Sequence, residues 1–321
     1  MSRNTRYPQI GIRSKYELAK RISDDYLPYQ KALDLINDSL LNFDEYWRDS
    51  KKSNIKEQKY VRTAIGTPLG ELLRRIDKLV LVPHDQKIPE FIFGGLSGRN
   101  HIQAAKSLLG KKRQRFLLGF DIARFFEQIN ESRVSYFFHK KCNCTLEASQ
   151  LLAKLCCVPT GPKGSGETYK TLARGFATSS RLAVWCNLDI FFRINWKVKQ
   201  QLHKYDPKVM IFVDDIGITA SCDDAKRMSA TEKIVIGILS HFDVHQPLPI
   251  NPKKTKRKSF SDGAQILGLG LGKNLSIGSK SRSRIDKTRL ALKAASPLEK
   301  RKLLQKRRGQ MTYKRQISQS V

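Results

Sequence analysis

The segment KVMIFVDDIGITA, residues 208–220, constrains the fold more than any other part of the sequence. Two apolar runs rich in β-branched residues flank Asp214 and Asp215, a pattern typical of two strands joined by a tight turn. A single alternating strand would send the two carboxylates to opposite faces, so it does not explain the pair. The segment therefore predicts a hairpin with adjacent carboxylates at its tip, and such a pair needs a positive partner.

The net charge of the chain indicates what kind of molecule it binds. Sixty Lys and Arg residues against 29 Asp and Glu give a formal net charge of +31 over 321 residues, 40% of which are hydrophobic. The hydrophobic content is enough for a sizeable core, but the net charge opposes compaction unless a polyanion binds. Nucleic acid is the first candidate, and an anionic membrane surface is a weaker one.

Neither membrane insertion nor a disulfide framework is expected. No run of about 18 apolar residues occurs, and the N-terminal MSRNTRYPQI lacks the apolar stretch of a signal peptide, which favours a cytoplasmic protein with no membrane partner. The spacing of the six cysteines suits neither a disulfide scaffold nor a zinc site, so we expect reduced core thiols. These cysteines are residues 142, 144, 156, 157, 186 and 222.

Periodicity predicts mixed α+β structure. A polar, basic loop before 60–65 fits a hairpin with a charged tip, and Thr67 with Pro68 fits the start of a helix. The run RFLLGFDIA at 115–123 reads as a central strand of a covered sheet. Further helices are expected within 14–43 and at 69–81, 101–112, 131–140, 146–157, 178–204 and 223–242, a strand at 263–271, and two short basic helices after 279.

Asp121 ends the apolar strand at 115–123, as Asp214 and Asp215 end another. If the two strands are neighbours, three carboxylates meet, and such a cluster is costly unless divalent cations bind it. Two Mg²⁺ ions, with Mn²⁺ as an alternative, would activate a 3′-hydroxyl and stabilise a leaving pyrophosphate. The plainer alternative is that Asp214–Asp215 is an ordinary turn dipeptide and that Asp121 caps a helix.

Several motifs in order resemble those of prokaryotic reverse transcriptases, in particular the retron-like and group II intron-like branch. FDIARFFEQI (120–129) is similar to the first catalytic motif, FVDD (212–215) to the paired-Asp motif, and INPKKTKRKS (250–259) to the Lys-bearing motif. The other similar segments are KYVRTAIGTPLGELLRRI (59–76), FGGLSGRN (93–100), LARGFATSSRLAV (172–184), ILGLGLG (266–272) and RGQMTYKRQI (308–317). The matched order makes chance agreement a poor explanation.

The resemblance implies a right-hand polymerase, in which an antiparallel palm sheet packs on helices. It divides the chain into an N-terminal helical region (1–55), fingers (56–114), a palm with part of the fingers interleaved (115–272) and a short basic helical thumb (273–321). It also implies metal ligation by Asp121, Asp214, Asp215 and the backbone of Ile122. Lys254, with Lys253 as the alternative, would assist the departing pyrophosphate.

The resemblance further assigns a nucleotide pocket and a primer grip. Phe126 would act as a steric gate against a ribose 2′-hydroxyl, one of Phe125 and Phe126 being a core residue, and Arg62 would hold the triphosphate. Arg174 and Gly175 would contact template or nucleotide, although the family's P-Q-G is here Ala-Arg-Gly. The primer grip would include Leu267 and Gly268.

The expected function is thus an RNA-directed DNA polymerase that copies a dedicated non-coding RNA, in a lineage associated with antiphage defence. Its partners would be an RNA template, dNTPs, the DNA product and, in such a system, an effector protein. The usual retron signatures are missing: no His follows Ala104–Ala105 at the family's spacing, and Ile266–Gly268 replaces V-T-G. Two alternatives stay open, a template-independent or protein-primed DNA polymerase and a catalytically silent RNA-binding scaffold.

Overall fold

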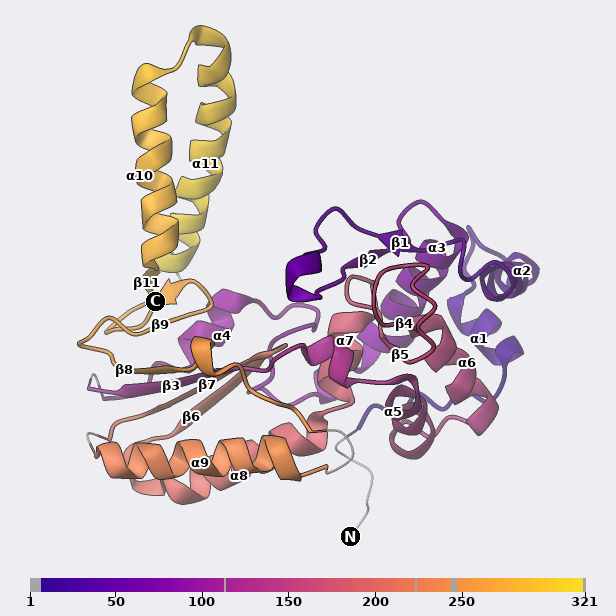
Figure 1. Ribbon diagram of the computed structural model, residues 1–321, viewed down its shortest axis with the longest axis horizontal. Coiled ribbons are helices and arrows are strands. Elements are labelled where there is room, and N and C mark those ends of the chain that lie inside the picture. The colour runs from indigo at the N-terminus through magenta and orange to yellow at the C-terminus, as the bar shows by residue number, and fades with distance from the viewer. Residues whose placement is uncertain (1–6, 113, 223, 244–246, 320–321) are drawn as a thin grey trace.

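The computed structural model describes residues 7–112, 114–222, 224–243 and 247–319. It combines helices with antiparallel sheets, so the expected α+β class is confirmed (Figure 1). A central sheet layered on helices lies beside a larger, mostly helical lobe, and a long helical hairpin projects from the end of the sheet. In the described part of the chain, no helix is both long and apolar enough to cross a membrane.

The elements fall close to the ranges that periodicity predicts. The α-helices are α1 (Lys15–Ile22), α2 (Tyr29–Leu41), α3 (Pro68–Arg75), α4 (His101–Ser107), α5 (Glu131–Tyr136), α6 (Leu146–Cys156), α7 (Ser179–Trp185), α8 (Leu188–Gln201), α9 (Ala225–His241), α10 (Ser279–Ala294) and α11 (Pro297–Gln319). The strands are β1 (Arg48–Asp49), β2 (Arg62–Thr63), β3 (Phe116–Asp121), β4 (Cys157–Pro159), β5 (Lys170–Leu172), β6 (Lys208–Phe212), β7 (Asp215–Ala220), β8 (Lys256–Ser259), β9 (Gln265–Ile266), β10 (Leu269–Gly270) and β11 (Ser276–Ile277).

The central sheet has the strand order β6-β7-β3-β8, and every pair is antiparallel. Its inner strands are apolar because both faces are covered: α8 and α9 lie on one face, and α4 lies on the other (Figure 1). β8 is an edge strand with three exposed basic residues, a composition that blunts unwanted strand pairing. The end of β3 and the start of β7 point toward the helical lobe.

The helical lobe is built from amphipathic helices around one apolar core. α1 and α2 pack on each other and bury Leu18, Ile22 and Ile36 completely. The Thr67 hydroxyl accepts a hydrogen bond from the Gly70 amide, and Pro68 occupies the first turn, which confirms the predicted start of α3. The same core continues under the central sheet, so the lobe and the sheet pack as one body.

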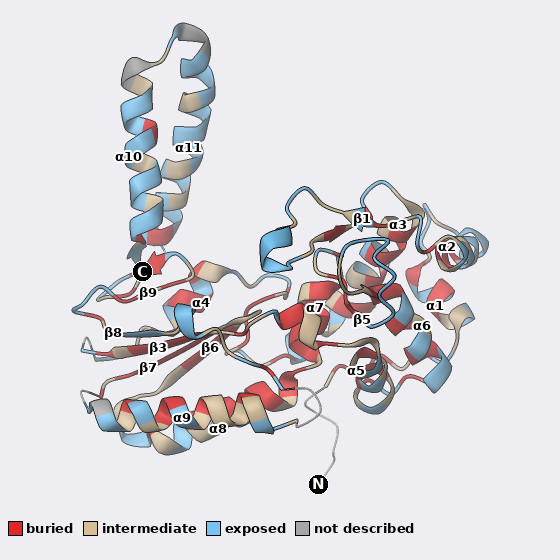
Figure 2. Cartoon of the chain, in the orientation of Figure 1, coloured by how far each residue is buried: buried red, intermediate tan, exposed pale blue. Residues whose placement is uncertain are grey.

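The C-terminal hairpin, which we define as α10 and α11, is mostly exposed along its length (Figure 2). Its foot is fixed by a second, smaller core that contains Ile317 and the three-stranded sheet β11-β10-β9. The Tyr313 ring stacks on His101 of α4 at 5.7 Å, and its hydroxyl lies 2.9 Å from His101 Nε2. Tyr313 therefore anchors the hairpin rather than facing outward.

Three predictions differ from the structure. The two basic helices after 279 are long rather than short, with 16 residues in α10 and 23 in α11. The expected strand at 263–271 is a hairpin of β9 and β10, turned at Leu267 and Gly268, which both have left-handed φ angles of 51° and 78°. The expected helix at 178–204 is broken into α7 and α8 at Cys186 and Asn187. The cysteines are free thiols as expected; all are buried except Cys186, which is half-buried.

Candidate active site

Three carboxylates meet at one end of the central sheet. Asp121, the last residue of β3, is the register partner of Asp215, the first residue of β7. Partners on antiparallel strands have Cα atoms about 4.5–5.5 Å apart. Asp214 sits in the two-residue turn between β6 and β7, and its carbonyl accepts a hydrogen bond from the Ile122 amide at 2.9 Å. Strand pairing therefore makes Asp121, Ile122, Asp214 and Asp215 neighbours at this end of the sheet.

The turn that carries Asp214 is strained. Val213 precedes it with φ 56°, in the left-handed region that β-branched residues avoid. A residue stays in such a conformation only where its surroundings hold it there, and such positions cluster at functional sites. The strain separates Asp214 and Asp215 from an ordinary turn dipeptide, where Asn or Gly would be expected at this position.

The carboxylates are held at an electrostatic cost. Burial raises the pKa of Asp215 to about 6, and the neighbouring charge of Asp214 adds to this effect. Burial also raises the pKa of Asp214, and Asp121 contributes in the same direction. Like charges gathered in a half-buried site favour either protonation or a bound cation. A cation beside Asp214 and Asp215 would therefore relieve this cost.

Lys254 supplies one such charge. Residues 249–251 cross the end of β3, where the Ala123 amide donates to the Pro249 carbonyl at 2.7 Å and the Asn251 amide to the Asp121 carbonyl at 2.8 Å. This crossing brings the Lys254 ammonium to 3.0 Å from both carboxylate oxygens of Asp121. The hydrogen bond with Asp121 raises the pKa of Lys254, so the side chain stays protonated.

The donor set suits a hard divalent cation. Carboxylate oxygens and a backbone carbonyl are ligands that Mg²⁺ and Mn²⁺ accept, and an ammonium group already rests on Asp121. The three carboxylates are neighbours but not yet a metal cage, since no group of three or more Asp, Glu, His or Cys side chains in the described part of the chain is arranged to hold a metal ion. These residues fit a divalent cation such as Mg²⁺, which would displace the Lys254 ammonium from Asp121.

Phe126 is more enclosed than a free gate residue. Both Phe125 and Phe126 are buried, so the expectation that only one belongs to the core is wrong; they lie in a short 3₁₀-helix, where strand alternation does not apply. The Arg174 guanidinium covers the Phe126 ring at 4.6 Å and is held there by Glu127 at 3.0 Å. A nucleotide sugar would reach Phe126 only after Arg174 moves.

Arg62 and Gly175 have structural neighbours instead of an open pocket. The Arg62 guanidinium is buried, pairs with Asp49 and donates to the carbonyls of Pro159 and Gly161. These contacts hold Arg62 inside the lobe, which does not suit a triphosphate ligand. A Cβ atom on Gly175 would lie 2.5 Å from the Arg62 carbonyl oxygen, so its missing side chain admits backbone of this chain rather than a base or sugar.

The cavity beside Arg62 and Arg174 is too small for a nucleotide. The cavity bordered by Arg62, Arg124 and Arg174 holds about 20 Å³, room for little more than a water molecule. Nucleotide binding here would require movement of the loop around Gln58, which contacts Arg124 at 3.4 Å. The structure thus forms the carboxylate cluster but does not open the predicted nucleotide pocket.

A larger basic cavity lies at the foot of the C-terminal hairpin. It has a volume of about 630 Å³, and its lining includes Lys256, Lys258 and Lys280 together with Gly268 of the predicted primer grip. Leu267 itself packs against the smaller core. The turn at Leu267 and Gly268 therefore forms part of a positively charged wall next to the edge strand β8, a surface suited to phosphate groups.

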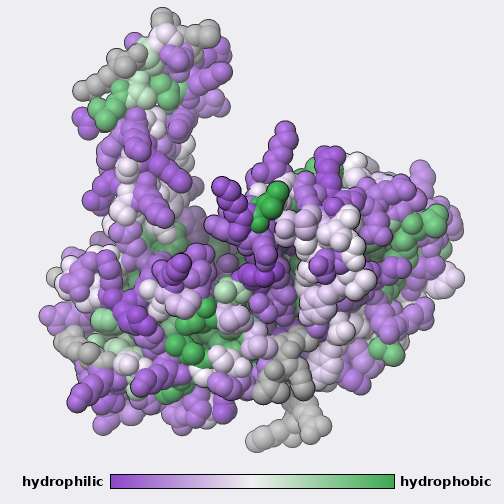
Figure 3. All heavy atoms as spheres, viewed as in Figure 1, coloured by the Kyte–Doolittle hydropathy of each residue, from purple (hydrophilic) through white to green (hydrophobic). Residues whose placement is uncertain are grey.

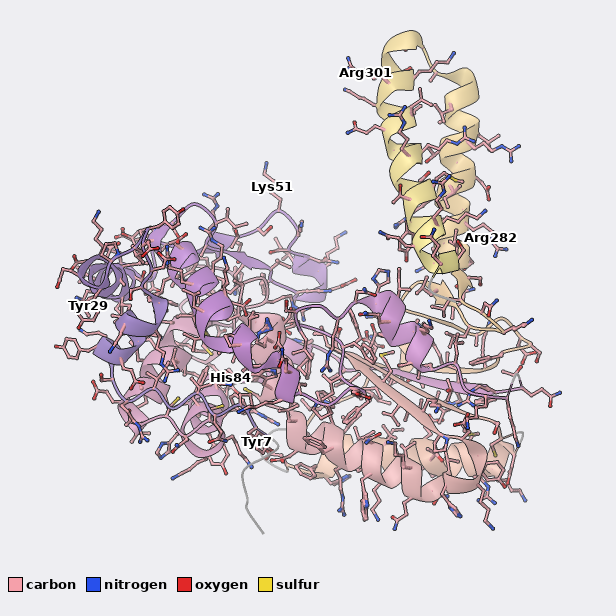
Figure 4. The ribbon with its side chains drawn as sticks, turned by 180° about the vertical axis from the view of Figure 1, so that it is seen from behind. Tyr7, Tyr29, Lys51, His84, Arg282 and Arg301 are labelled. Atoms are coloured by element: carbon pink, nitrogen blue, oxygen red, sulfur yellow. The ribbon has the colours of Figure 1, made fainter. Side chains whose placement is uncertain are left out.

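The molecule is hollowed between the C-terminal hairpin and the helical lobe, and both rims are hydrophilic (Figure 3). Arg301 near the tip of the hairpin lies on the side toward the lobe, Arg282 near the foot lies on the side away from it, and Lys51 projects from the lobe (Figure 4). The carboxylate cluster lies at the end of the sheet between these two bodies. A polyanion in the hollow would meet cationic side chains on both sides.

Sequence reasoning missed two features of this site. Glu127, the partner of Arg174, gives no signal beyond its place in FDIARFFEQI, and the left-handed Val213 is invisible because valine disfavours that conformation.

Comparison of the chain with models of known protein families gives no match, and comparison with curated protein sequences gives none either.

Proposed function

We propose that the protein is an RNA-directed DNA polymerase. The observation that carries the proposal is the meeting of Asp121, Asp214 and Asp215 at the end of an antiparallel sheet, with Lys254 on Asp121. A binding protein for polyanions has no reason to gather three carboxylates, because each repels the ligand. Together with the motif order along the chain, the cluster favours nucleotidyl transfer over a silent scaffold.

Each residue has a distinct part in the proposed reaction. Asp121, Asp214, Asp215 and the backbone of Ile122 would hold divalent cations, which in such sites favour ionisation of an attacking hydroxyl and bind the charge of the leaving phosphates. Lys254 stays protonated beside Asp121 and so carries both a proton and a positive charge to a departing pyrophosphate. The cationic hairpin would hold the template–primer duplex through its phosphates without reading sequence.

The test uses the protein purified with the RNA it carries, supplied with dNTPs and Mg²⁺. We expect labelled DNA complementary to that RNA from the intact protein, and none above background after Asp214→Ala with Asp215→Ala. The matched control is Asp44→Ala with Glu45→Ala, which removes an exposed pair of adjacent carboxylates after α2 and should leave synthesis unchanged.

Other outcomes separate the alternatives. DNA of simple sequence, unrelated to the bound RNA, would indicate a template-independent polymerase, for which the Arg174–Glu127 pair at the template motif is a candidate cause. RNA that stays bound while no DNA forms under any priming condition would indicate a scaffold. Equal synthesis by the intact protein and the Asp214–Asp215 double variant would contradict the proposed site.

A further inference from the structure

The segment 88–99 lies along the outer side of β6 and reaches the strained turn. The Phe93 amide donates to the Ile211 carbonyl, and the Ile211 amide donates to the Phe91 carbonyl, both at 2.8 Å. Ile92 and Ile211 form a parallel bridge, so the segment extends the central sheet by one short pairing. Two residues beyond Ile92, the segment leaves the strand and passes directly behind Val213.

Two consecutive glycines make this close passage feasible. A Cβ atom on Gly94 would lie 2.2 Å from the Val213 backbone nitrogen and 2.7 Å from the Phe212 carbonyl carbon. A Cβ atom on Gly95 would lie 2.6 Å from the backbone of Ser180, at the start of α7. The glycine pair is therefore wedged between the turn before Asp214 on one side and α7 on the other, with no room for a side chain on either.

A buried arginine fixes the wedge from the side of α7. Arg181, whose side chain is 5% exposed, donates to the Gly95 carbonyl at 2.6 Å and forms ion pairs at 3.3 Å with Asp77 and with Asp85. Asp85 also accepts a hydrogen bond from the Ser97 amide at 2.7 Å. The network thus links α7, the helical segments after α3 and both sides of the glycine pair.

Arg99 holds the other end of the same segment. Its guanidinium donates to the carbonyls of Ile88, Pro89 and Ile92 at 2.5–2.7 Å. Residues 88–97 are therefore tied by two arginines, by β6 and by Asp85. A surface loop does not need this number of fixed contacts, and most loops do not have them.

The ion pairs of Arg181 and the backbone conformation of Val213 both cost free energy, and they lie on opposite sides of the same two glycines. Burial raises the pKa of both Asp77 and Asp85, so the ion pairs of Arg181 are formed against a desolvation penalty. Val213 is strained on the opposite side of the glycine wedge. A role in folding alone would account for the ion pairs, but it would not account for the strain at the adjacent turn, since relaxing that turn would stabilise the fold.

We propose that residues 88–99, clamped by Arg181, act as a rigid strut that presses the backbone of Val213 into its left-handed conformation and thereby sets the position of Asp214 and Asp215. Arg181 and Gly94 are then positioning residues for the carboxylate cluster: the hydrogen bond and ion pairs of Arg181 go to Gly95, Asp77 and Asp85, and it acts on Asp214 and Asp215 only through the backbone. The inference rests on the proposed function, because it assigns the strut to the same cation-binding carboxylates.

The test compares Arg181→Lys with Arg115→Lys. Arg115 is also a buried arginine, bonded to Asp206 and Thr219, but it lies at the opposite end of the central sheet. Both replacements lose the forked guanidinium contacts, so both should lower the unfolding temperature to a similar degree. Only Arg181→Lys should weaken Mn²⁺ binding, measured by titration of the metal into the nucleic-acid-free protein, by about 5- to 10-fold.

The Mg²⁺ concentration that half-saturates DNA synthesis should rise by the same factor in Arg181→Lys and stay within about twofold in Arg115→Lys. Asp77→Asn is the milder variant if Arg181→Lys does not fold, because Asp85 still pairs with Arg181, and it should shift both readouts in the same direction. Unchanged Mn²⁺ affinity in folded Arg181→Lys or Asp77→Asn, or equal weakening in Arg115→Lys, would overturn the strut alone. An intact protein that binds no Mn²⁺ would overturn the proposed function and the strut together.

Discussion

At the scale of single residues, the candidate site contains several residues in environments or conformations that destabilise the fold. Asp214 and Asp215 are half-buried next to each other, Val213 is left-handed, and Asp121 is neutralised by the exposed Lys254 rather than by a buried partner. None of these choices stabilises the fold. Natural proteins tolerate such conflicts mainly at functional positions, where stability is given up for geometry.

The first prediction concerns Asp215. Its pKa of about 6 lies above the usual value for Asp, so the folded state binds more protons than the unfolded state between about pH 4 and 6. Stability should therefore fall as the pH rises through this window. In EDTA, Asp215→Asn should raise the free energy of unfolding by about 2–3 kcal/mol at pH 7.5 and by less than about 1 kcal/mol at pH 4.

Urea unfolding at both pH values measures this difference. Asp206→Asn is the control with the opposite sign: burial raises the pKa of Asp206, but hydrogen bonds from Lys208 and the Lys111 amide outweigh it and lower the pKa overall. That variant should be less stable than the intact protein at pH 7.5. An Asp215→Asn protein that is destabilised at pH 7.5 in EDTA would show that the carboxylate is stabilised by its surroundings.

At the scale of elements, apolar runs predict the central sheet well and the turns poorly. β3, β6 and β7 are continuous apolar segments bounded by polar residues, and each lies where periodicity predicts. ILGLGL also alternates like a strand, yet it folds as β9, a turn and β10. Leu267 occupies the left-handed region there, and no local rule places a leucine in that conformation.

In the candidate site, too, some residue positions could be predicted from the sequence and others could not. Asp121, Asp214, Asp215 and Lys254 were predictable because short motifs carry them and strand pairing brings them together. Arg62 was not, since its burial depends on Asp49 and on the carbonyl of Pro159, about 100 residues away along the chain. Positions set by local motifs and strand pairing can be predicted from sequence, whereas positions set by long-range packing cannot.

The second prediction tests the turn between β9 and β10. At most positions Ala is more stable than Gly, but at φ 51° the order should reverse, because only Gly adopts this conformation without strain. Leu267→Gly should therefore be more stable than Leu267→Ala by about 1 kcal/mol, since both lose the same side-chain packing. The same pair at Leu290, an exposed position in α10, should show the usual order by a similar amount.

Thermal unfolding of the four variants provides the comparison. If Leu267→Ala were the more stable of its pair, residue 267 would have a right-handed or extended backbone. The segment would then be closer to the continuous strand that its alternation predicts.

At the scale of the whole molecule, charge and shape act together. The chain has a net charge of +31, and its basic residues include those of β8, α8 and the C-terminal hairpin, of which only the hairpin stands clear of the rest of the protein. Tyr313 and Ile317 fix the foot of the hairpin on α4 and the small sheet. The hairpin is therefore a cationic arm of defined position, which stands on α4 and the small sheet and faces the helical lobe across the hollow.

The third prediction follows from this arrangement. Replacing Arg282, Arg284 and Arg289, three exposed residues of α10, by Gln should weaken binding of an RNA–DNA duplex and reduce its dependence on salt. Each lost phosphate contact lowers the slope of log K against log[salt] by about 0.9, so a loss of two to three contacts should reduce it by about 2–3. Replacement of Arg193, Lys197 and Lys199 on α8 removes the same charge from the opposite side of the central sheet and should leave the slope within about 0.5 of its original value. Filter binding at several salt concentrations measures both slopes. Equal reductions in the two triple variants would mean that net charge, rather than the placed hairpin, captures the duplex, and the carboxylate cluster would then need another element to bring a primer end to it.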